Sequence, residues 1–496
     1  MIQHCPVLIV LLPLTAALLC LLFSKFNKNL GSWLVIGSIA GSLACSLQVL
    51  HQTLTSGEAI HYWMGNWEPP LGIEFVIDPL SAVMAVLITF ISLMVAVYSK
   101  PFMRKEDWLH IGGYYTLYGL LTVGLCGMVI TGDMFNLYVY LEVMSLSGYG
   151  LIAMGGKKSM LAAFRYMLIG TIGASLYLIS VAYLYAMTGT LNMADLGERI
   201  MPYLSSPPFA LAVACLFIGF GIKMALFPLH GWQPDAYNFA HPGSAAFIAG
   251  VMSKVPAYAI IRFFFYIFGV NNPIISTALT VLGILGIGGV LIGSIMALAQ
   301  YDFRRMLAYS SVAQIGYIAI GLAIGNMYGF IGAVLHIINH AFMKSALFLV
   351  IRGIQYRFGE INLYRLGGLN KKMTLSTITV TLAALSMVGI PPTAGFFSKW
   401  YLMLGAYQGG QYFYIVILVI SSLLNAVYFF RILEQMFVQH EASLTEINRH
   451  EGKLGLPPEM AIPILCAGIG ILVLGFYSVD IVDDILKSGL PEVFLR

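Results

Sequence analysis

The sequence predicts an all-α polytopic membrane protein with about 14 transmembrane helices. Of its 496 residues, 59% are hydrophobic and only 10% are charged, whereas a soluble globular protein carries about 25% charged residues. The mean hydropathy is +0.85, and apolar runs long enough to cross a bilayer recur from end to end. The longest polar segments, 52–77 and 438–456, have the size of loops. We therefore expect no soluble domain between the spans.

Each predicted span is an apolar run close to the ~20 residues that a helix needs to cross the hydrocarbon core. The first run is expected to be a span rather than a removed signal peptide, because no small-residue cleavage site precedes a soluble domain. The twelfth run is long because it contains two adjacent prolines. The predicted spans are 5–23, 31–51, 78–99, 111–130, 133–154, 161–187, 207–229, 244–268, 274–299, 306–325, 328–352, 373–406, 412–437 and 457–477.

Lysine and arginine are unevenly divided between alternate loops, and this predicts the orientation of the helices. Because cytoplasmic loops carry the excess of basic residues, both termini are expected outside the cytoplasm, in the plasma membrane of a prokaryote. Arg262, near the outer end of span 8, is expected to extend its side chain to the interface. The basic loops hold Lys25, Lys28, Lys100, Arg104, Lys105, Lys157, Lys158, Arg165, Arg304, Arg305, Arg352, Arg357, Arg365, Lys371, Lys372, Arg431, Arg449 and Lys453, and the others hold Arg199, Lys487 and Arg496.

Four lysines lie within predicted spans: Lys223, Lys254, Lys344 and Lys399. A lysine at the bilayer centre costs about 2.5–3.5 kcal/mol on insertion scales. Such residues usually face the bundle interior, find partners and mark paths for ions or protons. The alternative for each is a structural ion pair that fixes one helix against another. For the four as a set, the sequence favours a transport role.

Two of these lysines accompany proline-containing interruptions of their helices. Lys223 lies in FGIKMALFPLHGWQPDAY (220–237), and Lys399 ends the run SMVGIPPTAGFFSK within 386–400. Proline removes a backbone donor and clashes with the preceding turn. Broken helices at equivalent places in two halves are typical of transporters built from inverted repeats. The backbone groups that a break frees can hold water, a proton or a cation beside the lysine.

Glu142 is the only acidic residue deep within a predicted span, in TGDMFNLYVYLEVMSLSGYG (131–150). We expect it to be the partner of one buried lysine, and the alternative is a static counter-ion. Asp133, at the mouth of the same span, is expected to start the helix. Desolvation disfavours the charged form of a lysine, and a nearby carboxylate favours it. A change in the separation of Glu142 and Lys223 would therefore switch the lysine between its charged and neutral forms.

His336, His340 and Lys344 recur at i, i+4 and i+8 in VLHIINHAFMKSALFLV (334–350), which places them on one helix face. This face could pass a proton along through waters. The alternative is that the histidines are structural and bond to neighbouring helices.

Lys254 lies near the middle of its span, in AAFIAGVMSKVPAYAIIRFF (245–264). We expect no metal ion and no haem or other cofactor, because neither carboxylates nor cysteines accompany the histidines at ligand spacing. Uncharged polar residues that could hold water in the same spans are Ser310, Ser311, Gln314 and Asn425.

These motifs resemble the antiporter-like subunits shared by respiratory complex I, the membrane-bound hydrogenases and the multisubunit Mrp cation/proton antiporters. The segments 67–82 (WEPPLGIEFVIDPLSA), the FFSKWYL ending and 421–432 (SSLLNAVYFFRI) are most similar to the D-type subunit of the Mrp-type antiporters and its close hydrogenase relatives. The other matching segments are DMFNLYVYLEVMSLSGYGLI (133–152), the Lys223 motif, AAFIAGVMSKVPAYAIIR (245–262), DFRRMLAYSSVAQIGY (302–317), HIINHAFMKSALFL (336–349) and GIPPTAGFFSKWYL (389–402).

The resemblance implies a fold of 14 helices with two inverted five-helix repeats, in which spans 7 and 12 are broken. The corresponding divisions are 1–110 (spans 1–3), 111–268 (first repeat, spans 4–8), 274–437 (second repeat, spans 9–13) and 438–496 (cytoplasmic loop, span 14 and tail). Some members carry an acid in span 12, whereas this chain has lysine, as D-type and N-type subunits do. No amphipathic arm follows span 14, unlike in the longest, L-type subunit.

The resemblance also implies roles for the buried charges. Glu142 and Lys223 would be the coupled pair, Lys254 the central relay, and Lys399 the titrating residue of the exit half. His336 and His340 would lie on the polar stripe between them.

The sequence contains no nucleophile–base signature, phosphate-binding loop or nucleotide fingerprint, so we expect no bond chemistry. Together with the resemblance it predicts a proton-translocating subunit of a multisubunit Na⁺/H⁺ antiporter. Its expected partners are other membrane subunits, H⁺, Na⁺ and the lipid bilayer, without nucleic acid. The alternative is a pumping subunit of a membrane-bound hydrogenase or an NADH-quinone oxidoreductase of the complex I type. A further alternative is a structural subunit that moves no ions.

Overall fold

The computed structural model describes residues 2–359, 362–363, 366–438 and 455–494. Arg365, Arg449, Lys453 and Arg496, which entered the orientation argument, lie outside these residues, as does most of the loop 438–456.

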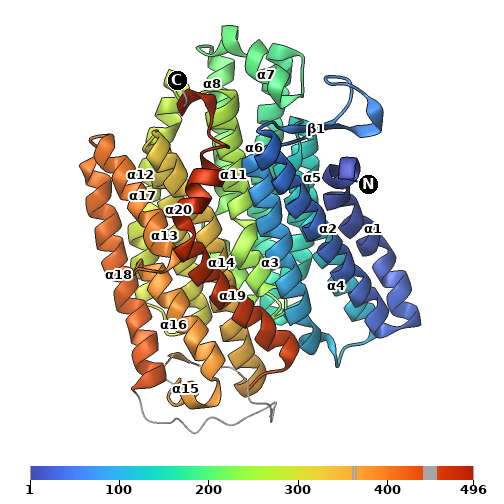
Figure 1. Ribbon diagram of the computed structural model, residues 1–496, viewed down its shortest axis with the longest axis vertical. Helices are drawn as coiled ribbons and strands as arrows, with labels where there is room; N and C mark the ends of the chain where they lie inside the picture. Colours follow the sequence, from blue (N-terminus) through green and yellow to red (C-terminus); the bar gives the residue numbers. More distant parts are fainter. Residues whose placement is uncertain (1, 360–361, 364–365, 439–454, 495–496) are drawn as a thin grey trace.

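The described chain is a bundle of long, roughly parallel and antiparallel helices (Figure 1). Among the described residues, twelve helices are long and apolar enough to cross a membrane. Helix α5 (Met134–Ala153) and a broken pair, α16 (Thr374–Val388) and α17 (Ala394–Gln408), complete the predicted 14 spans. The twelve are α1 (Cys5–Phe26), α2 (Lys28–Ser56), α3 (Pro79–Met103), α4 (Trp108–Ile130), α6 (Lys157–Thr188), α8 (Pro207–Met224), the composite span Ala245–Ile267, α12 (Pro273–Leu298), α13 (Phe303–Ala323), α14 (Met327–Phe358), α18 (Tyr412–Phe437) and α19 (Pro458–Phe476).

Short polar side chains begin many of these helices. The Asp78 carboxylate accepts the Ser81 N–H as part of a capping box at α3, and Asp107 and Asp133 cap α4 and α5 by accepting a backbone N–H. Asn27, Asn272 and Asn326 do the same at α2, α12 and α14. A cap satisfies backbone donors that have no partner within the helix. The predicted role of Asp133 as a helix-start residue is confirmed.

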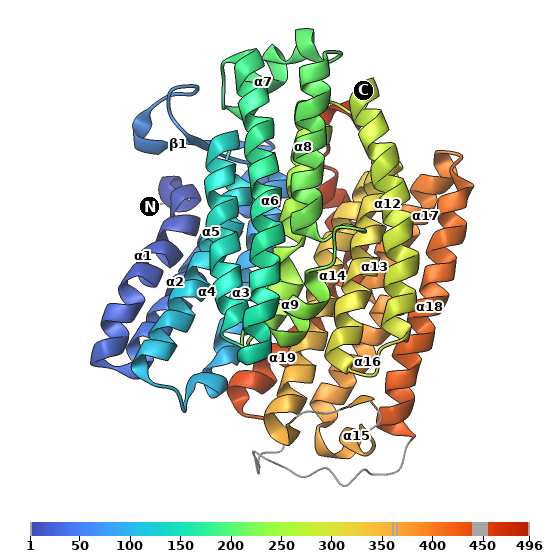
Figure 2. The same ribbon diagram turned by 180° about the vertical axis from the view of Figure 1, so that it is seen from behind.

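The helices form two groups joined by a central helix. Helices α1 to α4 lie on one side of the bundle, and α12, α13, α17 and α18 lie on the other (Figures 1 and 2). Helix α14 contacts α3 as well as α13, α16, α17 and α19. Helix α19 crosses the front of Figure 1 and packs on both α3 and α16. The helix that carries the histidines therefore lies at the centre of the protein.

One end of the bundle carries structure that the sequence analysis did not anticipate. Strands β1 (Ile60–Trp63) and β2 (Glu74–Ile77) form an antiparallel hairpin within the segment expected to be a loop. After α19, the chain continues through α20 (Ser478–Asp480) and η7 (Ile481–Leu486), and Tyr266 donates a hydrogen bond to the carbonyl of Gly489. Both termini lie in the upper half of Figure 1, as an even number of spans requires.

Arg262 has a partner within the protein. Its guanidinium pairs with the Asp78 carboxylate at 2.5 Å, and both side chains are largely buried. The expected extension of Arg262 to the membrane interface stays a prediction. The rings of Tyr258 and Tyr266 lie 5.6 and 4.6 Å from the guanidinium. The sequence reasoning missed this pair because Asp78 is 184 residues away and was assigned only to the start of span 3.

Candidate functional site

Lys223 lies in the last turn of α8, directly before the chain leaves the helix. Its side chain is 1% exposed, and its Nζ donates to Ser145 Oγ at 2.6 Å and to Tyr149 OH at 3.2 Å. Both acceptors come from α5. The ammonium is therefore held by hydroxyl groups of the neighbouring helix.

The break predicted in span 7 is present immediately after this lysine. Helix α8 ends at Met224, Ala225 has the left-handed φ of 61°, and α9 (Gln233–Phe239) resumes the span. At the end of α8, the Ile222 carbonyl accepts the indole N–H of Trp232 at 2.9 Å. The Trp232 ring stacks on Tyr166 with 3.7 Å between centroids. An aromatic side chain thus satisfies this helix end, and the Lys223 ammonium is turned to α5.

Glu142 lies three residues before Ser145 on α5, and its side chain is half-buried. The ordered polar partners of Lys223 are Ser145 and Tyr149, and no direct ion pair joins Glu142 to Lys223 in the described part of the chain. Residues three and seven positions apart share a helix face. Glu142 therefore lies on the face of α5 that supplies the two hydroxyls to Lys223.

Lys254 follows a widened turn of its span. The chain runs from α10 (Ala245–Phe247) into the π-helical segment η4 (Ile248–Met252), and α11 (Lys254–Ile261) begins at the lysine itself. The fully buried Nζ donates to the Ala249 carbonyl within η4 at 2.5 Å. Pro256 has no N–H to offer the preceding turn, and single π turns often occur at functional sites. The interruption of span 8 was missed in the sequence.

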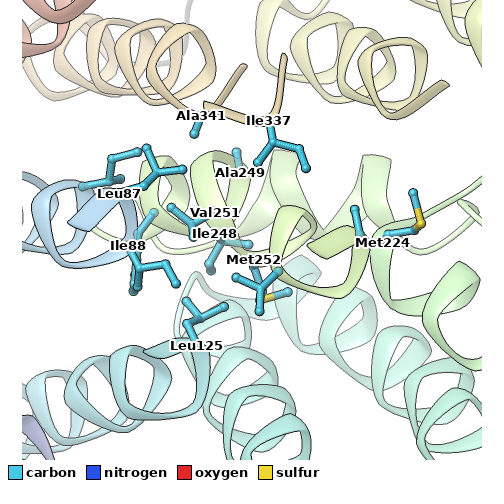
Figure 3. Close-up of a cluster of buried hydrophobic side chains, with 14 of the residues drawn as sticks. Leu87, Ile88, Leu125, Met224, Ile248, Ala249, Val251, Met252, Ile337 and Ala341 are labelled. Carbon is cyan, nitrogen blue, oxygen red and sulfur yellow. The ribbon is translucent and has the colours of Figure 1, made fainter. Parts of the chain in front are cut away.

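Apolar side chains surround the π-helical segment η4. Ile248, Val251 and Met252 lie near Leu87, Ile88 and Leu125, while Ala249 faces Ile337 and Ala341 of α14 (Figure 3). Such packing excludes water from this part of the core. The hydrogen bond of Lys254 to the Ala249 carbonyl therefore lies in largely apolar surroundings.

The polar face of α14 is fully buried. His336 bonds through Nδ1 to Ser398 Oγ and through Nε2 to Gln314 Oε1, both at 3.0 Å. The His340 ring stacks near His336 with 5.9 Å between centroids, and both of its nitrogens are buried without a hydrogen-bond partner.

Lys344 continues the same face of α14 and turns toward α13. Its Nζ donates to the Leu307 carbonyl at 2.8 Å and to Ser310 Oγ at 2.5 Å. The three residues predicted to share one face therefore do so, and α13 supplies partners to both Lys344 and His336.

Lys399 lies beside the second break, between α16 and α17. Its Nζ donates to the carbonyls of Met387 and Val388 at 2.8 and 2.9 Å and to Ser422 Oγ at 3.1 Å. These carbonyls end α16, where a helix carries partial negative charge. Gly389 has a φ of +94°, and a Cβ there would lie 3.0 Å from Lys399 Cδ. The break thus brings the lysine onto the end of the preceding half-helix.

Tyr317 connects the histidines with Lys399. Its ring stacks near His336 with 5.4 Å between centroids, and the Lys399 ammonium lies 4.9 Å from the same ring. Ser398, which bonds His336, precedes Lys399 in the chain. Tyr317 and Ser398 therefore connect His336 with Lys399. Lys254 bonds only a backbone carbonyl among the described contacts, and the His340 nitrogens have no hydrogen-bond partner there.

Sequence reasoning found the charged groups but missed most of the groups that hold them. Ser145, Tyr149, Tyr317, Ser398 and Ser422 were not singled out, whereas Ser310 and Gln314 were. Helical spacing could have found Ser145 and Tyr149, three and seven residues after Glu142. Ser311 bonds only to Leu307 of its own helix. Asn425 donates to the Met387 carbonyl, which Lys399 also uses.

A family model described as "NADH:quinone oxidoreductase/Mrp antiporter, TM" matches residues 131–425, which include every buried lysine. The chain belongs to this family. A second model, described as "NADH-Ubiquinone oxidoreductase (complex I), chain 5 N-terminus", matches residues 63–110. The predicted resemblance is confirmed, and the chain is a multi-pass membrane protein of the family.

Curated relatives of the family come from both kinds of complex. The chain is 45% identical over 498 residues to the N-type subunit of the NADH-quinone oxidoreductase of Desulforudis audaxviator, covering 99% of each protein. It is 31% identical to the D-type subunit of the Na⁺/H⁺ antiporter of Alkalihalophilus pseudofirmus, covering 99% of this chain and 98% of the relative.

Solved structures give the same picture of the fold. A chain of the Mrp complex from Dietzia sp. matches with a TM-score of 0.86 and 26% identity, covering 99% of this chain and 97% of the other. A chain of the membrane-bound sulfane sulfur reductase, an archaeal respiratory complex, matches with a TM-score of 0.90 and 28% identity, covering 99% and 98%. The predicted fold class, an all-α membrane protein of this architecture, is confirmed.

Proposed function

We propose that this chain is the proton-translocating membrane subunit of a multisubunit Na⁺/H⁺ antiporter. The observation that carries the proposal is the set of partners around the buried lysines. Lys223, Lys254, Lys344 and Lys399 donate to hydroxyls and backbone carbonyls, and none forms an ion pair with a carboxylate in the described part of the chain. Burial disfavours the charged form of a lysine, and no carboxylate of the described residues lies within ion-pair distance of these four. Such groups can release and regain a proton without breaking an ion pair.

The proposed route runs from Lys223 through Lys254 and the histidine face to Lys399. Hydroxyls and imidazoles along it can both donate and accept hydrogen bonds, as proton transfer requires. Buried polar atoms without a protein partner occur beside the route, among them the amide of Gln233 and both nitrogens of His340. Ordered water commonly satisfies atoms of this kind. Glu142 would act on Lys223 by moving relative to the hydroxyls of Ser145 and Tyr149.

The decisive experiment replaces Lys223 with alanine in the assembled complex and measures proton and Na⁺ transport in membrane vesicles. We expect transport to fall to background while the complex still assembles. Lys157→Ala, at an exposed position at the start of α6, is the matched control and should retain transport. Full transport by Lys223→Ala with normal assembly would exclude the route and would leave a structural role for the lysines.

A redox-driven complex is the second candidate, and the 45% identity to an NADH-quinone oxidoreductase subunit favours it. The same lysines would then move protons or cations at the expense of electron transfer in other subunits. Purification of the native complex separates the two candidates. Small membrane subunits alone would support the antiporter, whereas subunits with iron–sulfur centres would support the redox-driven pump.

The arrangement in the membrane and the internal repeats are part of the same proposal. Both termini would lie outside the cytoplasm of a prokaryotic cell, and the repeats would comprise residues 111–268 and 274–437. The two breaks support this division because they occur five spans apart, each beside a buried lysine. Cysteine labelling of the hairpin β1–β2 and of the turn between α3 and α4 in intact cells would test the orientation, since only the hairpin should react.

A further inference from the structure

A cavity of about 400 Å³ opens at the ends of the four N-terminal helices, far from the buried lysines. Its lining includes residues from where α1 passes into α2 and where α3 passes into α4, and both connections lie in the lower half of Figure 1. This is the side predicted to be cytoplasmic. The cavity belongs to none of the contacts described for the proton route.

The walls of the cavity are basic. Lys28, Lys100 and Arg104 line it together with a single acid, Glu459, which pairs with Arg104 at 2.5 Å. Lys28 donates to the Glu106 carbonyl at 3.2 Å, so this side chain is held at the rim. Three cations against one carboxylate leave an excess of two positive charges, which no protein anion in the lining balances.

An aromatic side chain fixes one of these cations. The Lys100 ammonium lies 3.3 Å from the centroid of the Trp33 ring, and the ring is 54% exposed. A cation–π contact holds an ammonium without neutralising its charge. Tryptophan is enriched at the level of the lipid headgroups. The pair therefore places a positive charge beside an exposed ring of the residue type that favours the headgroup level.

The rest of the surface suits an amphipathic ligand. Asn29 and Ser32 add polar groups to the cavity, whereas Met103, Ile111 and Tyr115 form its buried floor. Beside it, Leu18, Leu22 and Phe26 of α1 are 66, 54 and 78% exposed. An apolar helix surface that adjoins a basic pocket can take acyl chains while the pocket takes the headgroup.

We propose that this cavity binds the phosphate headgroup of an anionic phospholipid of the cytoplasmic leaflet. Lys28, Lys100 and Arg104 are the phosphate-binding groups, and Trp33 holds Lys100 in position. Basic pockets between transmembrane helices on the cytoplasmic side bind anionic headgroups in other membrane proteins. The site does not depend on which complex the chain serves.

Native mass spectrometry of the full chain, purified with its accompanying membrane subunits, tests the site. The purified protein is offered equal amounts of dioleoyl phosphatidylglycerol and dioleoyl phosphatidylcholine. The unchanged protein should retain phosphatidylglycerol preferentially. In Lys28→Gln/Lys100→Gln, the preference should fall by about fivefold for each lysine removed. Glu459→Gln frees Arg104 from its carboxylate and should strengthen the preference.

The matched control is Lys157→Gln/Lys158→Gln, which removes two exposed lysines on the same side of the bundle. It should retain phosphatidylglycerol as the unchanged protein does. An equal loss in this control, or no loss in Lys28→Gln/Lys100→Gln, would overturn the site. Displacement of the lipid by ~10 mM inorganic phosphate would overturn the lipid assignment in favour of a free phosphate ion. Thermal unfolding of each variant should stay unchanged, since Lys28 is exposed and Lys100 lies at the helix end.

Discussion

The two broken spans hold their lysines in opposite ways. At the first break, the Ile222 carbonyl accepts the Trp232 indole, and Lys223 turns away to the hydroxyls of Ser145 and Tyr149. At the second break, Lys399 itself donates to the carbonyls of Met387 and Val388. The first lysine is attached to the neighbouring helix, and the second is attached to the broken helix end.

This difference has a functional meaning under the proposed route. Ser145 Oγ also donates to the Leu141 carbonyl, so it keeps a partner whatever Lys223 does. A neutral Lys223 therefore leaves few groups unsatisfied, and it can respond to movement of the half-buried Glu142. At the end of α16, the Val388 carbonyl depends on Lys399 more strongly, whereas the Met387 carbonyl also accepts a hydrogen bond from Asn425. Lys223 is therefore suited to switching between its charged and neutral forms. At Lys399, a change of protonation would instead alter the hydrogen bonds that hold the end of α16.

The largest expected effect separates transport from stability. Lys399→Met should abolish transport and also destabilise the protein, because the Val388 carbonyl would lose its side-chain donor, and an unsatisfied carbonyl costs about 1–3 kcal/mol. Lys223→Met should abolish transport with a smaller loss of stability. Vesicle transport and the thermal unfolding midpoint of the detergent-purified complex measure the two effects. Equal shifts of the midpoint in both variants would remove the distinction between the breaks.

The second prediction concerns the indole that satisfies the first break. Trp232→Phe keeps an aromatic ring against Tyr166 but removes the donor to Ile222, which should cost about 1–2 kcal/mol. Trp400→Phe is the matched control, because Trp400 is 52% exposed on α17, and it should change stability little. Thermal unfolding compares the two. An unchanged midpoint for Trp232→Phe would mean that the Ala225 N–H, which also bonds Ile222, is sufficient.

Much of this arrangement follows from the sequence, for a physical reason. Span number, both breaks and the buried face of α14 depend on hydropathy, proline and helical spacing, all of which are local properties. The prediction that Lys223 and Lys399 each lie beside a helix break is therefore confirmed. Their roles in transport remain predictions.

The sequence failed where a contact joins distant segments. The Arg262–Asp78 pair and the hydroxyls around Lys223 depend on packing between helices, and the Trp232 contact depends on how the chain turns after α8. The π turn before Lys254 has no compositional signal beyond Pro256, because a widened turn uses the same residues as an α-helix. Glu142 illustrates the limit, since the acid could be found but its separation from Lys223 could not.

A smaller effect is expected on the connection between the histidines and the second break. Ser398→Ala removes the hydroxyl that bonds His336 Nδ1 and should slow transport by about three- to tenfold. Ser180→Ala removes a buried hydroxyl that has no partner and should leave transport unchanged. Initial rates in vesicles at fixed proton gradient measure both. A rate for Ser398→Ala equal to that of Ser180→Ala would disconnect His336 from Lys399.

The smallest expected difference between the two halves concerns the caps of α5 and α13. Asp133 caps α5 through the N–H of Asn136, whereas Asp302 at α13 accepts hydrogen bonds from both the backbone and the guanidinium of Arg304. Burial opposes ionisation of Asp302, but the hydrogen bonds and charge of Arg304 prevail and lower the pKa of its carboxyl below the usual value.

A lowered pKa in the folded protein fixes the sign of the pH dependence. The contribution of Asp302 to stability is fully present above the ordinary carboxyl pKa of about 3.9, and it is lost as the pH falls through the lower folded value. Asp302→Asn keeps the cap but removes the charge that pairs with Arg304, which should cost up to about 1 kcal/mol at neutral pH. The difference from the unchanged protein should shrink below about pH 4. Thermal unfolding of both proteins between pH 3 and 7 measures this difference. The absence of any difference across that range would show that the cap acts only through its geometry, because an asparagine side chain accepts the same backbone hydrogen bond without titrating.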